Sequence, residues 1–348
     1  MSVVTKGDGN SGRLTIREVA SRAGVSPATV SRVINGRPDV STELQETVMR
    51  VVRELGYTTR RASQTGTSGR TGLVGVTLPL VHHSYFSEIL AGATEAFYEH
   101  DVSIVLSPTM HEHDREVSLL ERLVRGGTDG ALLILPEESN EELSALHEQG
   151  YPFVIVDPQT PPDERVPTVS AANTSGGREA TEHLLSLGHR RIAVITGPRG
   201  WIATEERLRG YRGALADAGL LADPVLQIES DFRPSGGREA TAELLKLSDP
   251  PTAVFAFNDM LAIGALQAAR EHGVRVPEDL SVVGFDDTLE ASFTFPALTT
   301  VRQPLAEMGR MAVTQLVRLL QNRRIEALHV QLETTLVIRD STASLARR

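Results

Sequence analysis

The feature that most constrains the fold is a regular alternation, from residue 73 onward, of short apolar runs with longer amphipathic segments. Short apolar runs predict buried strands, and apolar residues at helical spacing predict helices that cover them. The predicted strands are Leu73–Leu78, Ser103–Leu106, Ala131–Leu135, Phe153–Val156, Arg191–Thr196, Ala253–Phe257 and Leu280–Phe285. The predicted helices are Ser87–Glu99, Arg115–Arg125, Gly177–Leu187, Glu205–Ala218, Gly237–Leu247, Asp259–Glu271 and Leu305–Gln321. This alternation indicates βαβ units and parallel sheets flanked by helices, and its length indicates two α/β lobes with ligands at the carboxyl ends of the strands.

The chain carries its charge unevenly. The full sequence has 35 Lys and Arg against 45 Asp and Glu, and the net charge of −10 by itself argues against nucleic acid as a partner. Residues 1–70 nevertheless contain 11 basic and 6 acidic side chains, whereas the remainder contains 24 and 39. A basic head on an acidic body is the asymmetry expected of a small DNA-binding module joined to a second, different module.

Residues 14–57 predict three short helices. Gly24 follows the first helix and permits a tight turn, while Ser26 is a good N-cap for the second helix, which we place at Pro27–Ile34. The third helix is predicted at about Thr42–Leu55. Two short helices joined by a Gly-containing turn, the second beginning with small side chains, form a helix-turn-helix motif. The alternative is a generic three-helix packing module, but the caps and the charge asymmetry favour DNA binding.

Composition also marks the segments between these regions. Residues 58–72 consist mainly of Thr, Ser, Gly and Arg, which is typical of a linker. We therefore expect a disordered tail at 1–13, a helix-turn-helix domain at 14–57, a hinge at 58–72, a two-lobed ligand-binding and dimerisation domain at 73–340, and a tail at 341–348. No leucine heptad follows residue 340, which favours a dimer over a tetramer.

Several classes of function lack support in the sequence. Cysteine is absent, which excludes disulfides and thiolate metal sites. No run approaches the length of a membrane span and the N-terminus lacks the layout of a secretory signal, so we expect a cytoplasmic protein. We find no catalytic constellation and no cofactor fingerprint, and expect neither catalysis nor a cofactor. His111, His113 and Asp114 suggest a metal site only weakly, because a solvated approach to a helix explains them better.

One short repeat occurs inside the α/β region. Ser175–Thr181 and Ser235–Thr241 both read SGGREAT, and each is followed by a pair of leucines. The strands that flank them do not match. We interpret the repeat as two independent, well-capped helix starts.

Several motifs, in the same order, resemble the LacI/GalR family of bacterial repressors. They are Thr15–Asn35 with its TVSRVIN run, Leu55–Tyr57, His183–Gly197, Phe255–Leu266, Ser281–Asp287 and Leu298–Pro304. The resemblance covers nearly the whole chain after residue 13. It implies a small all-α helix-turn-helix headpiece and a two-lobed α/β body like that of periplasmic binding proteins. It also implies a homodimer that reads a near-palindromic operator in double-stranded DNA and regulates transcription, usually by repression.

The resemblance assigns DNA contacts residue by residue. These are Thr15, Ser26, Pro27, Ala28, Thr29, Ser31, Arg32 and Asn35. By family position Pro27, Ala28 and Arg32 face bases, and the others place the helix on phosphates. Arg32 can pair in a bidentate manner with a guanine edge, although a plain phosphate contact is the alternative.

The hinge is where the sequence departs from the family pattern. Relatives usually carry a hinge helix with a Leu that wedges into the minor groove, but here that position holds Gly66, and no Leu occurs between Leu55 and Leu73. Glycine cannot unstack a base step. We therefore expect this protein to bend its operator less than its relatives do, or to use Ala62 in a shifted hinge.

The resemblance also implies an effector cleft between the lobes. Its candidate contacts are Tyr85, Phe86, Asp157, Trp201, Arg207, Phe232, Asn258, Asp286 and Gln303. Aromatic faces stack on sugar C–H faces, and carboxylate, guanidinium and amide groups bind hydroxyls, so a neutral mono- or oligosaccharide is the first choice. A purine that stacks on Phe232 remains open, as do a corepressor in place of an inducer, a packed surface role for Trp201 and an N-cap role for Asp286. A free solute-binding protein is the rival from another class, but it would need export.

Overall fold

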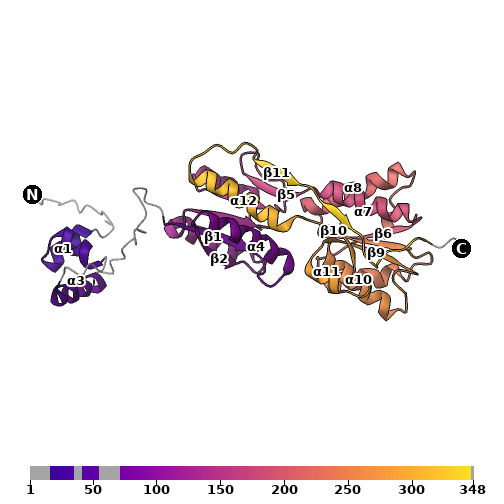
Figure 1. Ribbon diagram of the computed structural model, residues 1–348, viewed down its shortest axis with the longest axis horizontal. Helices are drawn as coiled ribbons and strands as arrows, with labels where there is room; N and C mark the ends of the chain where they lie inside the picture. Colours follow the sequence, from indigo (N-terminus) through magenta and orange to yellow (C-terminus); the bar gives the residue numbers. More distant parts are fainter. Residues whose placement is uncertain (1–15, 35–40, 55–70, 346–348) are drawn as a thin grey trace, which may run out of the picture. The chain divides into compact units, whose positions relative to one another are not determined.

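The computed structural model describes residues 16–34, 41–54 and 71–345, and the chain divides into two compact units, residues 1–69 and 70–348. The first unit contains α1 (Ile16–Ala23), α2 (Pro27–Ile34) and α3 (Thr42–Glu54) (Figure 1). Its core consists of Val19, Ala20, Val30, Val33, Val48 and Val51. The three helices therefore bury one apolar stripe each, as the helical spacing predicts.

The second unit begins with a lobe, here the N-lobe, built on a six-stranded parallel sheet with the order β11-β5-β4-β3-β1-β2. Its strands are β1 (Leu73–Leu78), β2 (Ser103–Pro108), β3 (Gly130–Ile134), β4 (Phe153–Val156), β5 (Thr168–Ala171) and β11 (His329–Leu332). Its helices are α4 (Ser84–Glu99), α5 (His113–Arg122, continued by a π-turn to Gly127), α6 (Asn140–Glu148) and α12 (Leu305–Leu320). Val154 and Val156 pack toward α4 and α12, whereas Phe153 and Ile155 pack toward α5 and α6. Alternate side chains of this buried strand thus pack into two hydrophobic cores, one on each face of the sheet.

The C-lobe has a second six-stranded sheet, with the order β12-β10-β9-β8-β6-β7, in which only the β10–β12 pair is antiparallel. Its strands are β6 (Ile192–Thr196), β7 (Gln227–Glu229), β8 (Ala253–Ala256), β9 (Ser281–Asp286), β10 (Thr299–Arg302) and β12 (Thr335–Val337). Its helices are α7 (Asn173–Ser186), α8 (Ile202–Asp217), α9 (Pro234–Leu244), α10 (Asp259–Glu271) and α11 (Leu289–Phe293). Helices α7 and α8 cover one face of this sheet, and α9 and α10 cover the other.

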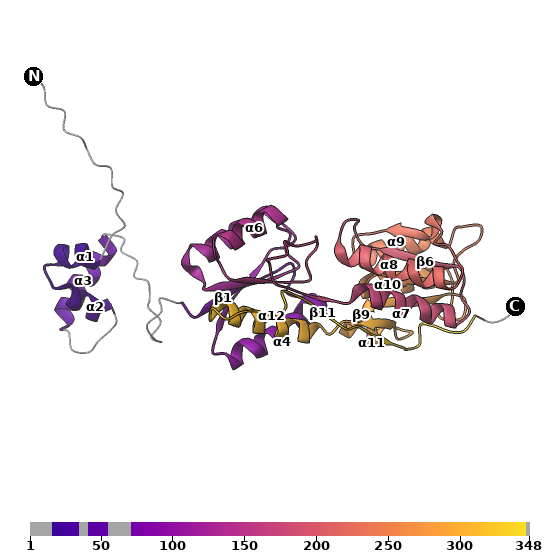
Figure 2. The same ribbon diagram turned by 90° about the horizontal axis from the view of Figure 1, so that it is seen from above.

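Three chain crossings connect the two lobes (Figures 1 and 2). The chain passes from β5 to α7 at Ala172, from β10 to α12 at Gln303–Pro304, and from β11 to β12 at Glu333–Thr334. Because the crossings are short, relative motion of the lobes is confined to a hinge at these positions.

The expected fold class is confirmed, and β1, β4, α2 and α10 have the predicted bounds. Sequence reasoning missed β5, β7, β10, β11, β12, α6 and α11. The missed strands have only three or four residues, and β10 carries two buried threonines, so none of them forms an apolar run. They form because a neighbouring strand supplies the hydrogen-bond ladder, which is a tertiary effect.

The interpretation of the SGGREAT repeat is wrong in one respect, because no side chain caps α7 or α9. The second glycine of each copy instead marks a close helix crossing. A Cβ on Gly177 would collide with the backbone of Arg207 in α8, and one on Gly237 would collide with the backbone of Leu261 in α10. The repeat therefore serves close helix packing on the two opposite faces of one sheet.

The C-terminal residues also pack on the C-lobe. Ser341, which we expected to begin a tail, is fully buried, and its hydroxyl donates to the Val282 carbonyl at 2.6 Å and accepts from the Thr299 amide at 2.8 Å. The Leu345 amide donates to the Leu187 carbonyl. These contacts attach residues 341–345 to β9, β10 and the end of α7.

Candidate functional site

The start of α2 is held by a side-chain cap. Ser26 Oγ accepts the amide of Thr29 at 3.1 Å and lies 2.8 Å from the Thr29 hydroxyl, and Pro27 occupies the first helical position. Val30 and Val33 are buried, while Pro27, Ala28 and Arg32 are exposed. The three side chains that the family pattern aims at bases thus lie on the outer face of the helix. Thr29 and Ser31 are half-buried, and Thr15 and Asn35 lie outside the described residues, as do Ala62 and Gly66 of the hinge.

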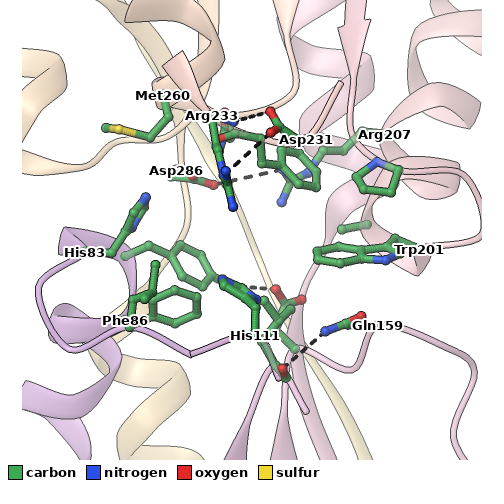
Figure 3. A pocket seen from close by; sticks show the side chains of 18 of the residues that line it. His83, Phe86, His111, Gln159, Trp201, Arg207, Asp231, Arg233, Met260 and Asp286 are labelled. Carbon is green, nitrogen blue, oxygen red and sulfur yellow. Dashed lines mark hydrogen bonds and ion pairs between the residues drawn. The ribbon is translucent and has the colours of Figure 1, made fainter. Parts of the chain in front are cut away.

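A pocket of about 330 Å³ lies between the two lobes of the body (Figure 3). Eight of the nine candidate effector contacts line it, namely Tyr85, Phe86, Asp157, Trp201, Arg207, Phe232, Asn258 and Asp286. The first three belong to the N-lobe and the other five to the C-lobe. Trp201 lies opposite Phe86 across the space, so the pocket has an aromatic wall on each lobe (Figure 3).

The ninth candidate, Gln303, does not line the pocket. Gln303 is buried in the crossing between β10 and α12, where its Nε2 donates to Asp286 Oδ1 at 2.7 Å. Asp286 stands between Gln303 and the pocket. Gln303 is therefore a positioning residue for a pocket carboxyl.

Arg207 is locked in place before any ligand arrives. Its Nε donates to Asn173 Oδ1 at 2.8 Å, one of its terminal nitrogens donates to the Phe257 carbonyl, and its guanidinium carbon lies 3.7 Å from the centre of the Phe285 ring. Only 3% of the residue is exposed. A guanidinium held on three sides loses little entropy when it donates to a ligand oxygen.

Two buried carboxyl groups flank this guanidinium. Asp157 accepts from the Tyr85 hydroxyl at 2.6 Å, and burial raises the pKa of Asp157. Asp286 Oδ1 lies 4.0 Å from a terminal nitrogen of Arg207, and burial raises the pKa of Asp286 to about 7. The pocket thus presents both donors and acceptors, which is what sugar hydroxyls require.

Asn258 lines the pocket but is largely engaged in the fold. Its Oδ1 accepts the amide of Leu261 at 2.8 Å and so caps α10, and its Nδ2 donates to the Phe232 carbonyl at 3.2 Å. The alternative we left open for Asp286, a helix cap, applies to Asn258 instead, since Asp286 ends β9 and caps no helix.

Strained backbone gathers at the pocket. Nine described residues other than glycine have positive φ angles. Five of them line the pocket: His111, Leu135, Asp157, Phe232 and Asp286, with φ between 51° and 118°. Such angles cost on the order of 1–3 kcal/mol each and persist where the surrounding structure enforces them. Their position at the carboxyl ends of strands turns the side chains into the space between the lobes.

Sequence reasoning missed much of the rim of the pocket. The missed polar and sulfur-bearing residues are His111, Gln159, Asp231, Arg233 and Met260. His111 Nδ1 lies 2.9 Å from Glu137 Oε1, and Arg233 Nε lies 3.5 Å from Asp231 Oδ2. His111 and Gln159 each follow a predicted strand, so the strand-end rule could have found both. Within the described part of the chain no group of three or more His, Asp or Glu side chains could hold a metal ion.

A family model described as "Bacterial regulatory proteins, lacI family" matches residues 15–60, and one described as "Periplasmic binding protein-like domain" matches residues 181–342. The transcriptional regulator CelR of Thermobifida fusca is 39% identical over 94% of this chain and 98% of its own. The repressor CytR of Escherichia coli is 32% identical over 95% and 97%.

The chain is also similar to solved structures of transcriptional regulators. The CelR–cellobiose complex has a TM-score of 0.73 at 37% identity and covers 94% of this chain and 100% of its own. The lac repressor dimer bound to operator and the anti-inducer ONPF has a TM-score of 0.71 at 28% identity, covering 95% and 100%. No helix in residues 16–34, 41–54 or 71–345 has both the length and the apolar character needed to cross a membrane.

Proposed function

Because this chain belongs to the LacI family of bacterial regulatory proteins, we propose that it is a repressor that binds one operator sequence as a homodimer and releases it when a small neutral sugar occupies the pocket between its lobes. The observation that carries the proposal is that side chains from both lobes line one pocket. A ligand held by both lobes binds more tightly when they are closed, and that difference in affinity is what allows it to shift a conformational equilibrium.

In this proposal α2 reads the major groove. The small side chains of Pro27 and Ala28 allow the helix start to approach base edges, and the Arg32 guanidinium pairs with a guanine edge. The other family positions, Thr15, Ser26, Thr29, Ser31 and Asn35, hold the helix on phosphates. We assign the headpiece to residues 14–57, the hinge to 58–72 and the sensing body to 73–340.

The sugar assignment rests on the chemistry of the pocket. Arg207, Asp157 and Asp286 offer donors and acceptors, and Trp201 and Phe86 offer apolar faces from opposite lobes. The CelR relative is named as a complex with cellobiose, which is a neutral disaccharide. A flat purine has less support, because the Trp201 and Phe232 rings meet at 42° with centres 5.6 Å apart and so leave no parallel slot between them.

One exposed apolar surface of the body suits a homodimer interface. Exposed apolar side chains gather on the edge strand β2, in the turn that follows it and on α11, where Leu106 is 36%, Met110 47%, Leu289 62% and Phe293 77% exposed. The Ser84 hydroxyl of α4 donates to Glu290 of α11 at 2.6 Å, so the N-lobe and C-lobe parts of this surface are neighbours. We propose that a second copy of the chain covers this surface, which otherwise leaves apolar area in water.

The proposal includes no catalytic step and no cofactor. It places the protein in the cytoplasm, because a repressor acts where the chromosome is. In this proposal the sugar is an inducer, which means that sugar binding weakens operator binding.

The test uses the full-length protein and fragmented genomic DNA. Fragments retained at physiological salt are sequenced, and the most enriched one is measured by fluorescence anisotropy with cellobiose, glucose or hypoxanthine present. We expect a fragment with a near-palindromic core, and a Kd that cellobiose raises by about tenfold or more, equivalent to about 1.4 kcal/mol of coupling. Retention of random fragments alone contradicts the DNA-binding part. A response to hypoxanthine and to neither sugar contradicts the sugar part.

A further inference from the structure

The space between the lobes contains a second cavity, here called the side cleft, that the proposed function does not use. It has a volume of about 560 Å³ and is lined by Asp157, Pro158, Pro161, Pro162, Thr168, Ser170, Asn173, Gly200, Ile202, Glu205, Glu206, Arg209, His329 and Gln331. Strands β5 and β11 of the N-lobe form one wall, and the first half of α8 in the C-lobe forms the opposite wall. The cleft is therefore another place where one small molecule can touch both lobes.

Backbone and side-chain contacts separate the side cleft from the effector pocket. The Ile202 amide donates to the Gln159 carbonyl at 2.8 Å, which joins the start of α8 to the loop that follows β4. Behind this contact, Arg207 of the pocket donates to Asn173 of the side cleft. Asp157 and Pro158 line both cavities. The two cavities therefore share a wall.

The polar side chains of the side cleft are available to a ligand. Within the described part of the chain, the side chains of Ser170, Glu205 and Gln331 have no hydrogen-bond or ion-pair partner. The prolines and Ile202 add apolar faces beside them. Hydroxyl, amide and carboxylate groups beside apolar faces suit a ring that carries hydroxyl groups on its edge.

The charge balance of the side cleft is acidic. Its lining carries the carboxyl groups of Asp157, Glu205 and Glu206 against the guanidinium of Arg209 and the imidazole of His329. Burial raises the pKa of Glu206, and the carboxyl of Asp157 also raises it, whereas Asn173, Arg209 and Arg207 lower it. A positive charge on the ligand would relieve this repulsion, whereas a carboxylate or phosphate would increase it.

From the walls, the free polar groups and the charge balance, we propose that the side cleft is a second effector site for a small amino-bearing polyol such as an amino sugar. Its occupant bridges β5 and β11 to α8, and so favours the lobe arrangement in which Ile202 meets Gln159. Because that arrangement also forms the effector pocket, the second ligand strengthens sugar binding in the first site, and the sugar strengthens binding of the second ligand by the same factor.

The experiment measures binding of glucosamine to the full-length protein by isothermal titration, with glucose as the isostere that lacks the ammonium group. We expect glucosamine to bind to the wild type and to Trp201→Ala, because Trp201 lines the effector pocket and not the side cleft. Glu205→Gln and Gln331→Ala should raise its Kd at least tenfold. Glu239→Gln, at an exposed glutamate of α9 that lines neither cavity, is the matched control and should leave the Kd unchanged.

A second measurement tests the coupling. With glucosamine at saturation, the Kd for cellobiose should fall several-fold in the wild type and remain unchanged in Glu205→Gln. Equal binding of glucosamine and glucose overturns the amino-group assignment, and loss of glucosamine binding in Trp201→Ala overturns the second site. If glucosamine binds as expected but cellobiose does not bind at all, the side cleft stands and the proposed sugar effector fails.

Discussion

The stability of the N-lobe should fall as the pH rises, and one glutamate should cause most of the decrease. Glu116 of α5 and Glu138, which follows β3, are 1% and 5% exposed, and three of their four carboxyl oxygens have no hydrogen-bond partner within the described structure. Burial raises the pKa of Glu116 to about 7 and that of Glu138 to about 9, and the neighbouring carboxyl of Glu116 raises the pKa of Glu138 further. Both groups are therefore protonated in the folded chain at pH values where the unfolded chain has released its protons.

The direction and size of the pH effect on the free energy of unfolding follow from this difference in protonation between the folded and the unfolded chain. A folded-state pKa above the unfolded value gives stability that is complete below the unfolded pKa of 4.5 and decreases as the pH rises toward the folded value. One extra proton on the folded chain corresponds to about 1.4 kcal/mol per pH unit. Between pH 6 and pH 8, Glu138 alone should therefore lower the free energy of unfolding by roughly 3 kcal/mol.

The assay is urea unfolding of the wild type and of Glu138→Gln at pH 6, 7 and 8. The amide keeps the shape of the protonated acid and cannot ionise. The free energy of unfolding of the variant should therefore fall much less between pH 6 and pH 8 than that of the wild type, and the variant should be the more stable protein at pH 8. Glu141→Gln in α6, at an exposed position, is the control and should keep the wild-type slope. An unchanged slope in Glu138→Gln would refute the reasoning.

Three further predictions concern DNA, sugar and dimer. Arg32→Ala should cost about 1–3 kcal/mol on the operator and relax specificity at one base pair, as competition binding would show; an equal loss on random DNA would mean that Arg32 contacts only phosphate. Trp201→Ala should abolish the response to cellobiose in fluorescence anisotropy while operator affinity without sugar stays within about twofold; a normal response would remove the aromatic wall from the site. Phe293→Ser should shift the dimer toward monomer in sedimentation velocity, and an unchanged dimer would place the interface elsewhere.

Local physical chemistry was enough to predict most of the fold. The apolar runs of β1 and β4 and the helical periodicity of α10 predict those elements with their observed bounds, because the two strands are almost wholly buried and the helix buries one continuous apolar face, so each carries its own signal. Strands β11 and β12 carry no such signal. They have half-exposed, partly polar sequences and pair with β5 and β10, which are more than 30 residues away in the chain.

The residues of the candidate site also divide into those that the sequence could place and those that only the tertiary structure places. The family resemblance implied Asp157, Trp201 and Asp286 as contacts, and the strand-end rule agrees with it, because Asp157 and Trp201 follow strands and Asp286 ends one. Gln303 could not be told apart from them by sequence, although it lies behind Asp286 and never reaches the pocket. Arg233 and the walls of the side cleft depend on which loops of two lobes face each other, and no local pattern encodes that.

By itself, the sequence determined the element types, the presence of a helix-turn-helix module and the strand ends where ligand-binding side chains occur, because propensity, capping and periodicity act over a few residues. Only the tertiary structure decided which of those side chains share a cavity, which support others from behind, and that a second cavity exists. Those outcomes depend on three chain crossings and on close helix packing, which bring together residues that are distant along the chain.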